Sequence, residues 1–277
     1  MNRKIKNMLI TLAFPVVMFL IMEAIAYTVK GTHVLNTILD VKNLIRNVGI
    51  TCTIAYALSF NLSSGRFDLS IGAQRLVSTT IGCIIALKLG FTGIGLLIMS
   101  IIFGVIFGLL AGIMFVITRV PPMVLGIGMG LIYECVAFAG SQSKGLSLFG
   151  VEVIEILTNI NFTIVVIFIV AAIVMMLMGY TKFGYHMRSI QGSQRIAQAS
   201  GINVFKHAVL CYAFAGGMVS VSGVFSAAFE GGMATSMGFA SNGAIYNGFF
   251  PMFLGQYMAK WSNQALGIIV ATITLSI

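Results

Sequence analysis

Few side chains in this sequence could do chemistry, and their spacing matches no catalytic or metal-binding group. The chain has three histidines and seven acidic residues in 277. His33, His186 and His207 are isolated from one another, so they indicate no metal site. The cysteines lie far apart inside apolar stretches, without metal or redox spacing, at Cys52, Cys83, Cys135 and Cys211. We therefore predict no catalytic residue, no metal and no cofactor in this chain.

A short polar segment between two apolar stretches is the most specific local pattern. It reads Gly65-Arg66-Phe67-Asp68-Leu69-Ser70-Ile71-Gly72, and we call it the signature turn. Asp68 or Ser70 can cap a following helix, because a side-chain oxygen accepts a free backbone N–H there. Gly65 and Gly72 allow a sharp turn and close packing. Two interpretations stay open: a helix cap at a membrane boundary, or a broken helix beside a translocation path.

The longest polar interval runs from Thr181 to Ala208, and we call it the basic loop. It carries Lys182, Arg188, Arg195 and Lys206 but no acidic residue, and long apolar stretches flank it on both sides. A loop between membrane-length segments lies in water, and its basic bias predicts the cytoplasmic side.

The composition indicates the kind of protein that holds these polar segments. Hydrophobic residues make up 58% of the chain and charged residues 8%, and the mean hydropathy is +1.03. An ordinary soluble domain has about a quarter charged residues, so we predict an all-α, polytopic membrane protein. The net charge of +9 is scattered between apolar runs, which favours orientation by loop charges over binding of nucleic acid.

Nine membrane-spanning helices are expected in a single membrane domain covering residues 1–277. The chain stops inside the ninth apolar segment, which predicts a tenth span beyond it. A short amphipathic piece is expected over Val151–Ile160, on the outer side. The spans are predicted at about Met8–Val29, Leu44–Leu62, Gly72–Leu87, Gly93–Ile117, Met123–Ala139, Phe162–Tyr180, Val209–Ala228, Ala244–Met258 and from Gln264 onward.

Positive charges are unevenly distributed between the two predicted sides. Five fall on the outer side, and Arg75 falls inside the third span. Ten fall on the inner side, as orientation by positive loops requires, namely Arg3, Lys4, Lys6, Arg66, Arg119, Lys182, Arg188, Arg195, Lys206 and Lys260.

Three segments together resemble a known family. Asp68–Ala73 is similar to the D-L-S-[VI]-G-[SA] signature of permease subunits of ABC importers for ribose, galactose, xylose and similar monosaccharides. That family includes the autoinducer-2 importer and is related to branched-chain amino acid permeases. Arg119–Pro122 resembles its R-V-P-P-F turn, and Gly192–Val204 resembles its cytoplasmic G-x-N-x-x-A-A-x-x-S-G-I-N-V segment. The resemblance covers about Asn47–Ala228.

The resemblance implies a role for the basic loop and for partner proteins. Such permeases insert a short cytoplasmic coupling helix into an ATPase subunit. Here Gln194–Ala199 can form that helix, with the glycine of Ser200-Gly201 as its C-terminal cap. No G-x-x-x-x-G-K-[ST] sequence occurs, so a partner ATPase would bind ATP. The implied partners are that ATPase, a second permease subunit (identical or paralogous) and an extracytoplasmic solute-binding protein, at the bacterial cytoplasmic membrane and its lipid. The implied coupling residues are Gln194, Arg195, Ala197, Gln198, Ser200, Gly201 and Asn203.

Four further residues are candidates for lining the path. Asn61, Phe67 and Asn242 are polar or aromatic residues beside predicted helix ends. Glu134 lies inside the fifth span, where an acid is costly unless it is paired or hydrated. A cavity-facing role and a plain interhelical hydrogen bond are both open for Glu134.

Two segments depart from the family pattern and keep alternatives open. Arg66-Phe67 stands where the family usually has Gly-Gly-Ile, and Phe249–Gly255 replaces a Gly-Gly turn. The alternatives are an ion-coupled secondary transporter and a degenerate permease that only partners a competent paralogue. The sequence leaves the solute and the identity of the second permease undetermined.

Overall fold

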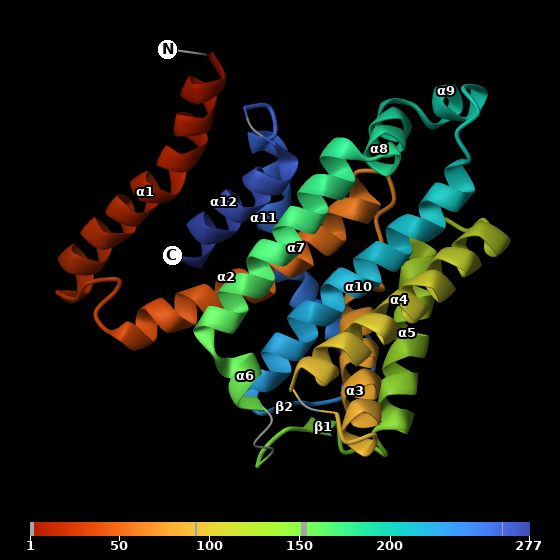
Figure 1. The fold of residues 1–277 in the computed structure, drawn as a ribbon, viewed down its shortest axis with the longest axis horizontal. Helices are drawn as coiled ribbons and strands as arrows, with labels where there is room; N and C mark the ends of the chain where they lie inside the picture. Colours follow the sequence, from red (N-terminus) through yellow and green to blue (C-terminus); the bar gives the residue numbers. More distant parts are fainter. Residues whose placement is uncertain (1–2, 92, 151–153, 262) are drawn as a thin grey trace.

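Each of the nine predicted spans corresponds to one long helix of the computed structural model, which describes residues 3–91, 93–150, 154–261 and 263–277 (Figure 1). Over these residues five helices contain a stretch long and apolar enough to cross a membrane, in α1, α4, α5, α7 and α10. The long helices are α1 (Arg3–Lys30), α2 (Ile38–Leu62), α3 (Ile71–Lys88), α4 (Gly93–Thr118), α5 (Pro122–Gly140), α7 (Ile160–Tyr180), α10 (Val204–Glu230), α11 (Gly243–Met258) and α12 (Gln264–Ser276).

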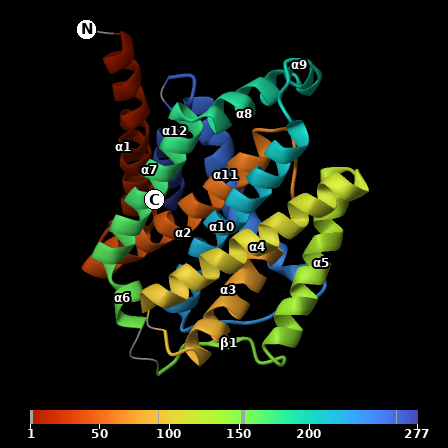
Figure 2. The ribbon, with the colours of Figure 1, turned by 45° about the vertical axis from the view of Figure 1, so that its right-hand side comes forward.

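Helix α10 is the centre of the bundle, and it packs most closely against α4 (Figure 2). Gly104 and Gly108 of α4 face the backbone of Gly216 and Tyr212 on α10, without room for a side chain between them. Gly112 lies in the same way against α10. Small residues at four-residue spacing thus let the two backbones touch. In this structure the spacing therefore serves packing within the chain.

Short elements close the two ends of the bundle, which Figure 1 shows at opposite extremes. One end carries α8 (Lys182–Gly192) and α9 (Gln194–Ala199). The other carries α6 (Glu155–Thr158) and an antiparallel pair of β1 (Leu146–Ser147) and β2 (Gly232–Met233). A short 3-10 helix, η2 (Ala240–Asn242), leads directly into α11. The expected amphipathic piece is partly realised as α6, while its residues 151–153 lie outside the described residues.

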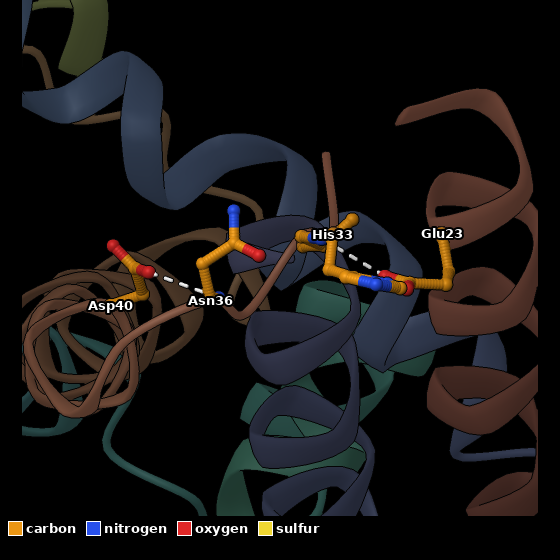
Figure 3. A network of polar contacts seen from close by, with 5 residues as sticks. Glu23, His33, Asn36 and Asp40 are labelled. Carbon is orange, nitrogen blue, oxygen red and sulfur yellow. Dashed lines mark hydrogen bonds and ion pairs between the residues drawn. The ribbon is translucent and has the colours of Figure 1, made fainter. Parts of the chain in front are cut away.

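The connection between α1 and α2 is fixed by two carboxylates (Figure 3). Glu23 accepts the backbone N–H of Val34 at 2.9 Å and contacts His33. Asp40 accepts the N–H of Thr37 at 2.8 Å and completes a capping box with it at the start of α2. The hydrogen bond from the Thr37 backbone holds the pKa of Asp40 below its usual range.

Candidate functional site

The signature turn is buried and irregular, and Asp68 holds it in place. Asp68 Oδ1 accepts the backbone N–H of Ser70 at 2.8 Å and its hydroxyl at 2.7 Å. Its Oδ2 accepts the Nδ2–H of Asn61, on α2, at 3.1 Å. Ser70 precedes α3 directly but makes no side-chain cap bond. Of the two predicted caps, Asp68 is therefore the one that organises the start of α3. Leu69 lies half-buried beside it, against Gly126 of α5.

A second helix also begins inside the bundle, next to the first. After β2 the chain returns inward, and Glu134 of α5 accepts the backbone N–H groups of Phe239 at 2.7 Å and Ser241 at 2.8 Å. Glu134 is 1% exposed. Gly72 packs against the backbone of Ser241. A Cβ added to Gly72 would lie 2.6 Å from the carbonyl oxygen of Ser241, so a side chain would not fit there. The start of α3 thus touches η2, which leads into α11. Among the described residues, Glu134 bonds to backbone N–H groups at the start of η2 and not to another side chain.

Asn242 lies at this same junction and is buried. Its Oδ1 has no hydrogen-bond partner among the described residues. A buried amide oxygen without a partner is costly. At least one buried hydrogen-bond acceptor at this junction therefore has no partner among the described residues of this chain.

The two segments that depart from the family pattern contact each other. The ring of Phe67 stacks on that of Phe249, with centroids 5.3 Å apart and planes 3° from parallel. Arg66, predicted in an inner loop, is 3% exposed instead. Its guanidinium lies over the ring of Phe115 and donates to the carbonyl of Val204 at 3.4 Å. Residue Arg66 thus ties the signature turn to the start of α10.

The basic loop folds into two helices. The side chain of Thr181 caps α8, and that of Ser193 caps α9. Helix α9 covers Gln194–Ala199, as the sequence predicts, and Ser200 follows it. Gly201 has the left-handed backbone (φ 84°) that glycine adopts at little cost. Asn203 caps α10 by accepting the N–H of Lys206 at 2.9 Å.

Helix α9 is exposed except where it touches the signature turn. Gln194, Arg195 and Gln198 are exposed, and Ile196 is 69% exposed. Ala197 is buried beneath the helix. Gln194 Nε2 donates to the carbonyl of Ser64 at 3.3 Å, and Gln194 is also the nearest neighbour of Gly65. Four of the predicted coupling residues, Gln194, Arg195, Ala197 and Gln198, therefore lie on one helix that contacts the chain at Ser64 and Gly65, while Ser200, Gly201 and Asn203 lie in the connection from α9 to α10.

The described residues contain no group of three or more His, Cys, Asp or Glu that could hold a metal. His207 packs instead against the ring of Phe183, with centroids 4.5 Å apart, and contacts the carbonyl of that residue. The site as described therefore consists of hydrogen-bonded polar groups at the starts of α3 and α11, together with the exposed helix α9.

The sequence and the fold resemble those of known transport proteins. Residues 41–277 match the family described as branched-chain amino acid transport system / permease component. A solved structure described as an inward-facing metal-chelate type ABC transporter aligns over 96% of this chain and 87% of its own, with a TM-score of 0.54 and 13% identity. At that identity the likeness concerns the fold alone. No curated protein matches the sequence.

Proposed function

Because the chain belongs to the family of permease components of branched-chain amino acid transport systems, we propose that it forms half of the translocation path of an ABC importer for a monosaccharide or similar small polar solute. As a member of that family it is a multi-pass membrane subunit of a binding-protein-dependent ABC system and is not itself the catalytic subunit. Family membership assigns the energy source to an ATPase, which argues against the ion-coupled alternative.

The position of α9 is the observation that supports this proposal most directly. The helix protrudes from the end of the bundle that carries α8, and its exposed side chains include Arg195 and Gln198 (Figure 1). Gln194 and Ala197 attach it to the rest of the chain. A short helix with a free outer face and a fixed inner face can dock into a groove of an ATPase and pass its movement to the signature turn.

The remaining parts of the proposal rest on the sequence resemblance. A monosaccharide is proposed because Asp68–Ala73 and Gly192–Val204 are similar to segments of sugar permeases. A second permease subunit, identical or paralogous, would enclose the other half of the path. An extracytoplasmic binding protein would deliver the solute, and the complex would lie in the bacterial cytoplasmic membrane.

The test is the stimulation of ATP hydrolysis in the complete complex, co-purified with its ATPase and reconstituted with and without loaded binding protein. Arg195→Glu reverses the charge on the exposed face of α9. Like charges in an interface cost several kcal/mol, so stimulation should fall by about tenfold or more. Gly201→Val should also lower stimulation, because a side chain in the left-handed conformation costs about 1–2 kcal/mol and redirects the chain.

Lys182→Glu is the matched control. It makes the same charge change on an exposed residue of the same loop, but outside α9. It should leave stimulation close to that of the unmodified complex. Full stimulation in both Arg195→Glu and Gly201→Val would show that α9 is only a solvated connection, and the proposed coupling would be wrong.

A further inference from the structure

A polar cavity of about 640 Å³ lies between α2, α3, α10, α11 and α12. It extends to Glu230, the last residue of α10, next to β2 at the end of the bundle predicted to be extracytoplasmic. Small-molecule sites in proteins usually measure about 300–1,000 Å³. The polar groups that line it include Asn47, Thr51, Arg75, Ser226, Glu230 and Asn247.

Arg75 is the unusual residue of this cavity. It lies in α3 four residues after Ile71, and its buried Nε has no hydrogen-bond partner among the described residues. A cation at membrane depth costs roughly 2.5–3.5 kcal/mol on insertion scales. The start of a helix adds to this cost, since its dipole repels positive charge. Arg46 also has a buried Nε without a partner among the described residues, but its guanidinium lies over the ring of Phe229. Arg66 leaves one buried nitrogen unpaired in the same part of the chain, yet Arg66 and Arg188 each donate to a backbone carbonyl.

Glu230 is the only acidic residue that lines the cavity, but it does not neutralise Arg75 directly. No ion pair joins the two residues within 4.0 Å in the described part of the chain. The carboxylate of Glu230 instead accepts the hydroxyl hydrogen of Ser226 at 2.7 Å. The cavity therefore presents a positive and a negative group separately, each with capacity for a further partner.

The stem of the Arg75 side chain packs against α10. A Cβ on Gly223 of α10 would lie 3.2 Å from Arg75 Cγ, so the arginine stem lies closely against this glycine. Residues Ala244, Tyr246 and Asn247, near the start of α11, line the same cavity. The positive end of α11 therefore adds to the field of Arg75.

We propose that this cavity is a solute site of the permease itself, open to the extracytoplasmic side, in which Arg75 binds an anionic group. Glu230 accepts hydrogen bonds from hydroxyl or ammonium groups of the same solute. The identification of the occupant as a transported solute rests on the proposed function. Within the proposed range of small polar solutes, it favours molecules that carry a carboxylate, phosphate or similar group, such as an acidic sugar derivative, over a neutral monosaccharide.

The experiment measures the field of Arg75 with two thiol reagents in cells that contain the full complex. Asn247→Cys in a Cys135→Ser background places one reactive cysteine in the cavity, since the other native cysteines are buried. The rates of labelling by a sulfonate-bearing and a trimethylammonium-bearing methanethiosulfonate are compared. Arg75→Gln should lower the ratio of sulfonate to ammonium rates by about threefold or more, as expected for removal of a charge within several Å.

Two further variants and a distant site make the result decisive. Arg75→Lys keeps the charge and should restore the ratio, while Glu230→Gln should raise it. At the exposed Ser147→Cys, on β1, the ratio should not respond to any of these changes. An unchanged ratio in Arg75→Gln, or no labelling of Asn247→Cys by either reagent while Ser147→Cys reacts, would overturn the proposal. The labelling needs neither ATP nor binding protein, so this outcome is independent of the α9 test.

Discussion

Replacing Asp68 by alanine should destabilise the start of α3 far more than an equivalent change elsewhere. The substitution leaves two buried N–H donors, Ser70 N and Asn61 Nδ2, without their acceptor. Each unsatisfied buried donor costs about 1–3 kcal/mol, so Asp68→Ala should cost about 2–6 kcal/mol. Asp40→Ala is the control, because Asp40 also accepts backbone N–H groups but lies near the surface, where water replaces them. Its cost should be about 0.3–1.5 kcal/mol.

The measurement is the apparent melting temperature of the purified complex in detergent, followed by uptake in cells. Asp68→Ala should lower the melting temperature several times more than Asp40→Ala does. Asp68→Asn should fall between them, because its amide oxygen still accepts one hydrogen bond while the charge is lost. Equal shifts for Asp68→Ala and Asp40→Ala would refute the inference that the carboxylate organises the signature turn.

Two other predictions concern topology and the aromatic contact. Ser193→Cys should not react with an impermeant thiol reagent in intact cells, whereas Ser147→Cys should react, because the positive charges of the basic loop favour the cytoplasmic side. The reverse labelling pattern would show that the predicted orientation is wrong. Phe67→Ala and Phe249→Ala should each lower stability, with a coupling of about 0.5–1.5 kcal/mol in a double-mutant cycle of melting temperatures. Additive losses of stability in the two substitutions would show that the contact between the stacked rings adds no stability of its own.

The arrangement of helices along the chain could be predicted because apolar length and charge are local properties. The span predicted at Gly93–Ile117 is α4 at Gly93–Thr118, and the predicted coupling helix Gln194–Ala199 has the bounds of α9. In both cases the signals are neighbours in sequence. For α4 the signal is an uninterrupted apolar run, and for α9 it is Gly201, which adopts a positive φ. Such signals can be recognised in the sequence without knowledge of the tertiary structure.

The contacts between distant segments could not be predicted in the same way. Glu134 bonds to the backbone of Phe239 and Ser241, more than 100 residues away. Nothing in the local pattern of α5 shows that its acid would meet a chain that turns back into the bundle. The sequence places Arg66 among the positive charges of the inner side, but the local pattern does not show that it is buried with its guanidinium over the ring of Phe115. These outcomes depend on where α3 and α11 begin, which hydropathy alone does not indicate.

The broken start of α3 connects the two ends of the molecule. On one side, Gln194 of α9 donates to the carbonyl of Ser64, just before the signature turn. On the other, the helix that this turn begins carries Arg75 into the cavity. A continuous α2–α3 helix would spread a push from α9 along its whole length. With a break held by one carboxylate, the proposed docking at α9 would act first on the start of α3, the helix that carries Arg75. If both proposals hold, the signature turn is the element that joins the ATPase contact at α9 to the solute site at Arg75.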